Sequence, residues 1–408
     1  MAKLRAVPLF LPACGLALAL ALAACGGGSG DPYGSDSNGN GTSSPTYTTL
    51  LEYVDAPLSS AYAVPTVSGR AETGSVTVRL REDEAGNLSV SFSITVTSLD
   101  PSDMLTAAHI HEGSVTGSGG VFVGLVDGST IAFSGATASG AVDVTAAEAA
   151  ALQDSARSFY VNVHSTQVGS GLARAQLGVT IDRALNIALA PDPPLDGRSD
   201  AGEAILRILD DGTLAYTLVV TDLGSGDTLT NAHIHRSSDS TVFVGFSPTF
   251  VPDTATAGRY TATGTVPLTA EDLAALADSA QGFYVNVHSS DYSGGLMRGD
   301  LPDPDATLTW IQTNVFTMTC AVSGCHRSPL TTAPMSLEAG AVPGTLVHVA
   351  STGMPSLLRV KPGDPDNSIL IQRLEGTVTP QMPFGGTPLD AATIARIREW
   401  ITLGARDD

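Results

Sequence analysis

A long internal repeat limits the fold of this chain more than any other feature. The segment Ala-His-Ile-His at 108–111 returns at 232–235, and Phe-Tyr-Val-Asn-Val-His-Ser at 159–165 returns unchanged at 283–289. Both pairs are separated by 124 positions. Solenoid repeats have much shorter periods, so we expect a duplicated domain rather than a repeat array.

Each copy has the sequence pattern of short β-strands. Residues 88–96, for example, alternate apolar with polar side chains and are rich in Val, Ile and Ser. A short helix should follow in each copy, because Thr145 with Glu148 and Thr269 with Asp272 have the spacing of a capping box. Short strands separated by turns predict an antiparallel sandwich or barrel.

The repeated segments resemble the CHRD domain, the module first described in chordin. The resemblance rests on His-Ile-His, Val-Asn-Val-His and the Gly-Leu-Met-Arg-Gly-Asp-Leu segment at 295–301, and it covers about residues 49–302. The first copy, at 171–177, has lost one of these glycines. We expect one CHRD-like domain at 49–178 and a second at 179–303. The resemblance implies extracellular β modules.

Histidines on these strands carry the one chemical hint in the repeats. In a strand, His109 and His111 point to the same face about 7 Å apart, and His164 on a later strand would add a third imidazole. The second copy repeats the set with His233, His235 and His288. Three imidazoles suit Cu or Zn, and the pattern is similar to the copper-binding strand of Cu,Zn superoxide dismutases, although no fourth histidine or bridging carboxylate accompanies it. Alternatively, the histidines are structural and bond to Asn162, Asn286 or the backbone.

The charge of the chain restricts its partners. Its 41 acidic and 20 basic residues give a formal net charge of −21. A phosphate backbone would repel such a chain, so nucleic acid is not an expected partner. No Ser-His-Asp order, phosphate-binding loop or paired-carboxylate cleft stands out, so we do not expect a hydrolase or a kinase.

The N-terminus resembles that of a bacterial lipoprotein. Residues 1–25 have a short positive start and an apolar run that ends in Leu-Ala-Ala-Cys25. This resemblance implies cleavage before Cys25, lipidation of its thiol and a membrane anchor, and Gly26 suggests the outer membrane. The alternatives are a plain secretory signal cut after Ala24 and an uncleaved helix. The Gly/Ser/Asn/Asp-rich segment 26–48 predicts a flexible linker.

Two cysteines outside the leader, Cys320 and Cys325, are followed directly by His326. Two thiols can form thioethers with haem vinyl groups, and the next histidine can bind the iron. Such attachment is normally written C-x-x-C-H. The gap here is four residues, and the small pair 323–324 could bulge out. The alternatives are a Cys320–Cys325 disulfide and a zinc site, for which His348 is the other histidine at hand.

The last hundred residues resemble a class I cytochrome c. The shared order, over about 305–405, is a helix, the Cys-x4-Cys-His segment, loops, a Met-Pro pair and a terminal helix. This resemblance implies that Met382 is the sixth iron ligand, with Met335, Met354 and His348 as rivals. Two axial protein ligands favour electron transfer over oxygen chemistry.

Three helices are expected in this part of the chain. The first lies at 309–316, and the second at 367–374 with Ser368 as its N-cap. The third is the terminal helix, with Thr387 as its cap. Its apolar face is formed by Ile394, Ile397 and Ile401.

These patterns together predict a multidomain protein: two all-β antiparallel sandwich or barrel domains and a small, mainly α cytochrome c-like domain at 304–408. The leading hypothesis is an exported, lipid-anchored electron carrier, not an enzyme, with one haem c and an unknown redox partner protein. The repeats would then serve as a stalk or docking platform. One alternative is a surface binding or adhesion protein that acts through the repeats and has a disulfide-closed C-terminal domain. Another is an enzyme that uses Cu or Zn on the His-x-His strands.

Overall fold

The computed structural model of the chain describes residues 45–192, 198–329 and 335–408. The leader at 1–25, with the expected lipidation of Cys25, lies outside these residues, as does most of the expected linker. The linker prediction was too long at its end, because Tyr47 and Thr48 already pair with the second strand. Within the described residues, no helix is long and apolar enough to cross a membrane.

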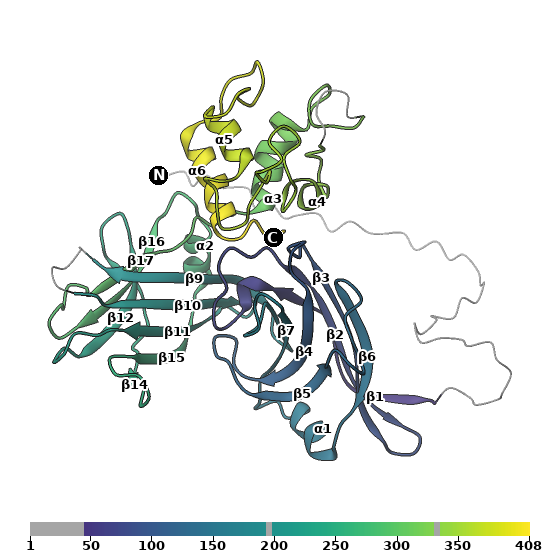
Figure 1. Cartoon of the computed structure of the whole chain (residues 1–408). Coiled ribbons are helices and arrows are strands. Elements are labelled where there is room, and N and C mark those ends of the chain that lie inside the picture. Colours follow the sequence, from purple (N-terminus) through teal and green to yellow (C-terminus); the bar gives the residue numbers. More distant parts are fainter. Residues whose placement is uncertain (1–44, 193–197, 330–334) are drawn as a thin grey trace, which may run out of the picture. The chain divides into compact units, whose positions relative to one another are not determined.

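The first repeat folds into one curled antiparallel sheet (Figure 1). Among the described residues this sheet has eight strands, in the order β5-β4-β7-β8-β1-β2-β3-β6. The strands are β1 (Tyr47–Ser59), β2 (Thr73–Asp83), β3 (Leu88–Thr97), β4 (Leu105–Glu112), β5 (Val121–Val126), β6 (Thr137–Asp143), β7 (Phe159–Ser165) and β8 (Ala173–Gln176). A short 3-10 turn, η1 (Ser60–Tyr62), follows β1. The edge strands β5 and β6 contact each other, so the sheet is barrel-like.

The second repeat folds in the same way, with one short strand added. Its sheet has nine strands in the described part of the chain, in the order β13-β12-β16-β17-β9-β10-β11-β15-β14. They are β9 (Ile181–Pro191), β10 (Ala201–Leu209), β11 (Thr213–Thr221), β12 (Leu229–Arg236), β13 (Val242–Gly245), β14 (Val251–Pro252), β15 (Tyr260–Pro267), β16 (Phe283–Ser289) and β17 (Met297–Asp300). The predicted pair of all-β antiparallel domains is therefore confirmed.

Alternation of side chains builds the core of each sheet. In β3, Val90, Phe92 and Ile94 are buried. The residues on either side of Ile94, Ser93 and Thr95, are exposed. The helices α1 (Ala146–Leu152) and α2 (Ala270–Leu276) begin where the capping boxes predict, and both boxes are formed. Each repeat thus encloses an apolar core of its own.

The same alternation carries polar residues to the opposite face of β4 and β7. Ala108 and Ile110 of β4 face the core, so His109 and His111 lie on the other side of the strand. In the register of these strands, His109 pairs with Asn162 and His111 with Tyr160. Strand β7 is buried along nearly its whole length, so its polar face is covered as well.

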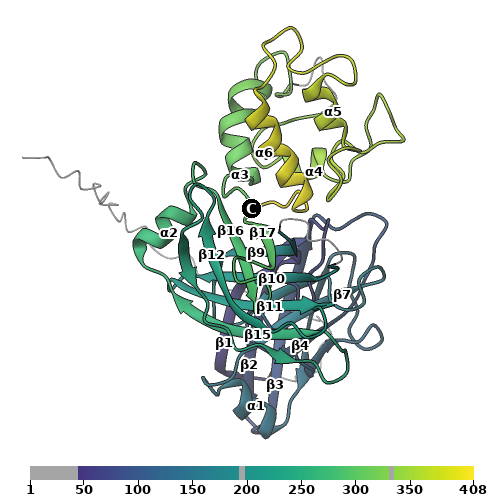
Figure 2. The ribbon, with the colours of Figure 1, turned by 90° about the vertical axis from the view of Figure 1, so that its left-hand side faces the viewer.

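The C-terminal part of the described chain is helical. Helix α3 (Leu308–Ile311) continues into a wide π-helix, η2 (Gln312–Cys320), which ends at the first of the two cysteines. The other helices are α4 (Val342–Leu346), α5 (Ile369–Glu375) and α6 (Ala391–Thr402). Helices α3 and α6 pack on one core that contains the buried Trp400 (Figure 2).

Two expected helix caps need correction. Helix α6 begins after Asp390, whose carboxylate accepts a hydrogen bond from the amide of Thr393, so Thr387 is not its cap. Ser368 does stand at the N-cap position of α5, but its hydroxyl makes no cap bond. It accepts instead from the amide of Lys361. Of the expected apolar face of α6, Ile397 and Ile401 are buried, and Ile394 is partly buried.

Candidate functional sites

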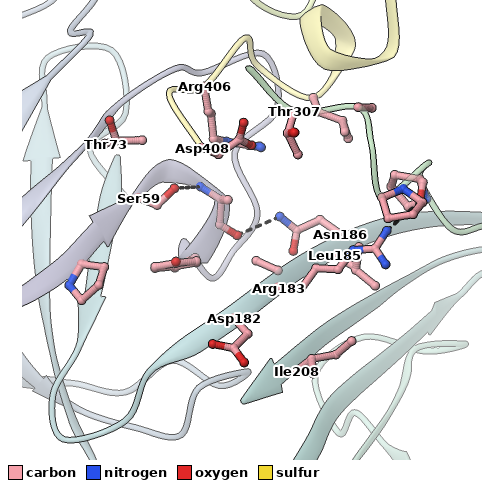
Figure 3. A pocket seen from close by; sticks show the side chains of 18 of the residues that line it. Ser59, Thr73, Asp182, Arg183, Leu185, Asn186, Ile208, Thr307, Arg406 and Asp408 are labelled. Atoms are coloured by element: carbon pink, nitrogen blue, oxygen red, sulfur yellow. Dashed lines mark hydrogen bonds between the residues drawn. The ribbon is translucent and has the colours of Figure 1, made fainter. Parts of the chain in front are cut away.

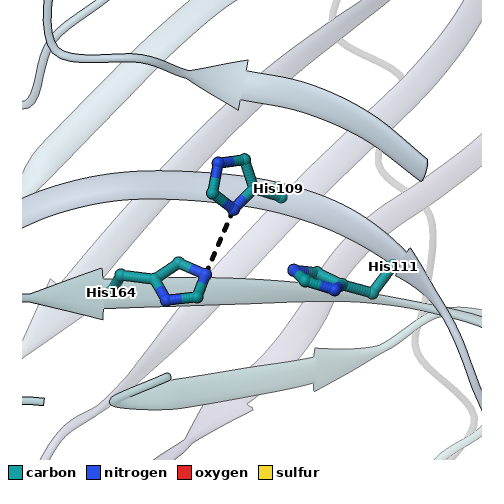
Figure 4. A group of neighbouring side chains, drawn as sticks. All are labelled: His109, His111 and His164. Carbon is teal, nitrogen blue, oxygen red and sulfur yellow. Dashed lines mark hydrogen bonds between the residues drawn. The ribbon is translucent and has the colours of Figure 1, made fainter. Parts of the chain in front are cut away.

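The structure gathers three histidines of the first repeat on the outer face of its sheet. His109 and His111 come from β4 and His164 comes from β7 (Figure 4). The Nδ1 atom of His109 lies 3.1 Å from Nε2 of His164, and one ring nitrogen from each residue lies within 4.8 Å of the others. The rings of His109 and His111 are 5.6 Å apart. Three separate ligand atoms can thus converge on one point.

The second repeat reproduces this arrangement. His233 and His235 lie on β12, and His288 lies on β16. Nδ1 of His233 is 3.1 Å from Nε2 of His288, and these three residues also meet within 4.8 Å. All six histidines that the sequence singled out in the repeats therefore belong to one of two triplets.

Backbone carbonyls fix the orientation of two rings in each triplet. Nδ1 of His111 lies 2.9 Å from the carbonyl oxygen of Gly119, and Nδ1 of His164 lies 3.0 Å from that of Gly169. A carbonyl can only accept, so each Nδ1 carries the proton and Nε2 keeps its lone pair. The corresponding contacts in the second repeat join His235 to Ser240 and His288 to Ser293, at 2.9 and 3.0 Å.

Burial favours the neutral form of four of these imidazoles, those of His109, His111, His233 and His288. It lowers the pKa of His109 to about 4, and the nearby rings of His164 and His111 add to that effect. Burial is also the main cause that lowers the pKa of His111, His233 and His288. At neutral pH these rings therefore hold no extra proton that would compete with another ligand.

A tyrosine and an arginine support one ring of each triplet. The ring of Tyr160 stacks on His111 at 5.2 Å, with an angle of 13° between their planes. The guanidinium of Arg174 lies 3.6 Å from the centre of the Tyr160 ring. Tyr284 and Arg298 repeat this stack on His235. The sequence reasoning missed these residues, although each pair is separated by the repeat distance of 124 positions.

A buried carboxylate anchors the loop that follows His164. The sequence patterns did not predict this role. The side chain of Asp103 accepts hydrogen bonds from Ser165, Thr166, the amide of Gln167 and the guanidinium of Arg70. Burial alone would raise the pKa of this carboxyl, but the hydrogen bonds outweigh burial and lower the pKa to about 2. Asp227, 124 positions later, has the corresponding network and its pKa is also lowered to about 2.

We expect these two carboxylates to make the β domains sensitive to strong acid. Their folded pKa values of about 2 lie below the unfolded value of about 3.9, so they stabilise the fold fully above about pH 5. This stability is lost as the pH falls from about 4 to about 2, and each side chain should account for about 2 kcal/mol. Urea unfolding of the metal-free protein between pH 7 and pH 2.5, followed by circular dichroism, measures the loss.

Asparagine substitutions supply the controls for this prediction. Asp103→Asn should lower stability at pH 7 and flatten the dependence on pH below pH 4. Asp210→Asn should keep the wild-type profile, because Asp210 is exposed and its side chain forms no hydrogen bond with another described residue. If Asp103→Asn and Asp210→Asn have the same profile, the assigned role of Asp103 is wrong.

The Cys-x4-Cys-His segment forms a closed loop at the end of η2. The amide of His326 donates to the carbonyl of Cys320 at 3.1 Å, and the amide of Cys325 donates to Val322 at 3.0 Å. Gly324 has a φ of +81°, a left-handed conformation that favours glycine. The two extra residues of the gap are thus accommodated by a local bulge.

Both cysteines of this loop are free thiols. Burial, together with the nearby Cys325, raises the pKa of Cys320 to about 11, so Cys320 stays protonated at neutral pH. Among the described residues, no group of three possible metal ligands includes Cys320, Cys325 or His326. The geometry thus gives no support to the zinc alternative.

His326 has its ring oriented by the backbone. Its Nδ1 lies 3.3 Å from the carbonyl oxygen of Met335, and burial lowers its pKa. Cys320, Met335 and Met382 pack against the same apolar core. Of the two remaining rivals for the sixth ligand, Met354 does not join that core, and His348 has its Nδ1 3.8 Å from a carboxylate oxygen of Asp100.

A cavity of about 710 Å³ lies elsewhere in the structure. Its lining includes the polar residues Ser59, Asp182, Arg183 and Arg406 (Figure 3). The side chain of Arg183 already donates to backbone carbonyls at 2.7 and 2.8 Å. None of the residues that the sequence singled out for chemistry lines this cavity.

Comparison with known proteins found one family. Residues 54–177 and 186–301 each match the model of the CHRD domain. No match was found among curated proteins or among solved structures. The two matched segments contain both histidine triplets, whereas the Cys-x4-Cys-His loop lies outside them.

Proposed function

Because the chain belongs to the CHRD domain family through both of its β domains, we propose that its distinct activity lies in the C-terminal domain, as one-electron transfer by a covalently bound haem c. CHRD domains are here the modules that carry this domain and dock it. The observation that carries the proposal is the hydrogen bond of His326 to the carbonyl of Met335. It places the proton on Nδ1 and leaves Nε2 for the iron, as second-sphere bonds of ligating histidines do.

The thiols next to His326 fit the same group. Cys320 and Cys325 are free, and the loop between them closes without using either sulfur. Each thiol can therefore add to one haem vinyl group. The wide helix that ends at Cys320 is also of a kind found frequently at functional sites.

Exposed apolar side chains flank the expected ligands. In the described part of residues 304–408, the large apolar side chains that are exposed are Met318, Val322 and Phe384, at 71, 36 and 79 %. Each lies within two residues of Cys320 or Met382. An apolar macrocycle held by Cys320, Cys325 and Met382 would give these three side chains a partner.

Met382 is the sixth ligand in this proposal. It shares the apolar core with Cys320, so both segments belong to one packed unit. A bound haem supplies an iron that exchanges one electron reversibly, and a His-Met ligand pair raises its potential. If both His326 and Met382 bound the iron, no position would be left open for a substrate, which would favour electron transfer over catalysis. We therefore propose an electron carrier rather than an enzyme.

The rest of the proposal concerns where the carrier works. Lipidation of Cys25 would anchor it to a membrane, proposed to be the outer membrane, and the linker would let the folded domains stand away from the surface. The partner would be another redox protein. Since acidic residues outnumber basic ones by 41 to 20, a basic partner surface would be favoured electrostatically.

The test is to export the full chain in a host that attaches c-type haem. We expect one haem per chain that survives acid-acetone extraction and gives a sharp reduced c-type spectrum. Replacing both thiols, Cys320→Ser with Cys325→Ser, should abolish covalent haem, whereas Ser323→Ala should not. A folded, colourless wild-type protein would refute the proposal.

The sixth ligand needs a separate comparison. Met382→Leu should convert the iron from low spin to high spin and lower its reduction potential. Met354→Leu, which also removes a methionine that precedes a proline, should leave spectrum and potential unchanged. An unchanged spectrum in Met382→Leu would transfer the role to another residue.

A further inference from the structure

We propose that each CHRD domain of this chain also binds one divalent transition-metal ion, of the Cu²⁺ or Zn²⁺ class, through three imidazoles. In the first domain the ligands are Nδ1 of His109, Nε2 of His111 and Nε2 of His164. In the second they are Nδ1 of His233, Nε2 of His235 and Nε2 of His288. This inference rests on the histidine triplets alone and does not depend on haem in the C-terminal domain.

The spacing of the nitrogens fits one ion. Neighbouring ligand atoms of a tetrahedral ion with bonds of about 2.0–2.1 Å lie about 3.4 Å apart. Nδ1 of His109 and Nε2 of His164 are 3.1 Å apart, and the third nitrogen lies within 4.8 Å of them. The three nitrogens are therefore close enough together to be ligands of one ion.

In two of the three rings of each triplet, the tautomer directs a lone pair inward. His111 and His164 each use Nδ1 for a backbone carbonyl, so each Nε2 is an acceptor that faces the triplet. This is how ligating histidines are held in metalloproteins: the outer nitrogen donates and the inner one binds. The loops that supply the carbonyls differ between the domains, since Gly119 follows its histidine by eight residues and Ser240 by five. The same bond is thus made by two different loops.

One buried nitrogen in each domain lacks a partner. Nε2 of His111 and Nε2 of His235 are buried, and no hydrogen bond reaches either of them from the described residues. Leaving a buried polar atom unpaired is energetically unfavourable, so such atoms are rare in folded proteins. One metal ion at the centre of each triplet would give the unpaired Nε2 atom of that domain a partner.

The donor set selects the class of metal. Each group consists of imidazoles, with no carboxylate or thiolate. Ca²⁺ and Mg²⁺ prefer oxygen ligands, whereas Zn²⁺ and Cu²⁺ accept three neutral imidazoles. On the β5 side His109 lies opposite Gly124, where an added Cβ atom would meet nothing within 4 Å. Gly124 therefore places no side chain beside His109 that could block an ion.

The experiment is a titration of the full, tag-free chain with Zn²⁺ in a Cys320→Ser/Cys325→Ser background, which removes the two thiols of the C-terminal domain as competing ligands. We expect two tight sites per chain. His111→Ala should leave one site, and His111→Ala with His235→Ala should leave none. His348→Ala, a histidine outside both triplets, should keep two sites.

Two further readouts keep the test decisive if a variant folds poorly. Zn²⁺ should raise the melting temperature of the parent protein, and Mg²⁺ at the same concentration should not. With Cu²⁺, electron paramagnetic resonance should show coupling to imidazole nitrogens from two equivalent sites. The inference would be overturned if Zn²⁺ did not bind. It would also be overturned if binding were weak and the number of bound ions were the same in the parent protein and in the histidine variants.

Discussion

Trp400→Ala should lower the free energy of unfolding of the C-terminal domain by about 3–5 kcal/mol. The indole is 1 % exposed and packs with Ile311, Phe316 and Ile397 in the core on which Cys320 also lies. Its Nε1 donates to the carbonyl of Arg406 at 2.9 Å. Truncation therefore leaves a cavity and an unpaired acceptor at the same place. A loss of this size is enough to unfold a domain of ordinary stability.

The chain offers a built-in probe for this measurement. Its two tryptophans are Trp310 and Trp400, so fluorescence reports on the C-terminal domain alone. In Trp400→Ala, Trp310 remains as the reporter, with Arg396 above its ring at 4.3 Å. Urea unfolding should be measured on protein produced without haem, because haem would quench the fluorescence.

Ala395→Ser is the control variant, since Ala395 lies on the exposed side of α6, the helix that contains Trp400. It should change the free energy of unfolding by less than about 0.7 kcal/mol. If the two variants unfold at the same urea concentration, Trp400 does not hold the core together.

The strands could be predicted from the sequence because their signal is local. Alternation placed His109 and His111 on one face, and the repeat showed which histidines correspond between the domains. The carbonyls that orient them could not be predicted, because Gly119 and Ser240 lie in loops without a periodic pattern. The sequence could not predict that Nε2 of His111 is buried without a partner, because this depends on which residues cover the outer face of the sheet.

Helix ends in the C-terminal domain show where local rules conflict. Thr387 and Asp390 are both good N-cap residues, and Pro388 fits the first turn after Thr387. The structure uses Asp390, which bonds the amide of Thr393. Ser368 occupies the predicted cap position, but the turn before α5 takes its hydroxyl. Sequence therefore located these helices to within a few residues, and tertiary contacts decided the bonds at their ends.

Gly171→Ala should destabilise the first β domain by about 3 kcal/mol and weaken Zn²⁺ binding at its site at least ~10-fold. Gly171 has a φ of +128°, which side chains rarely adopt, and a Cβ atom there would lie 2.2 Å from Nδ2 of Asn162. Asn162 is buried and lies opposite His109 in the sheet. Relief of this clash must move Asn162 or the loop that contains Gly169, whose carbonyl holds the ring of His164.

Gly169→Ala is the matched control for this prediction. It changes the same loop, has open space for a Cβ atom and keeps the carbonyl that His164 needs. Chemical unfolding followed by circular dichroism measures the change in stability. Titration of the two variants with Zn²⁺ in the Cys320→Ser/Cys325→Ser background measures the change in affinity. In Gly171→Ala the second domain should still bind one ion with parental affinity, because Gly295 and Asn286 form their own contact there. Equal Zn²⁺ affinity at both sites of Gly171→Ala would mean that the orientation of His164 does not control the first site.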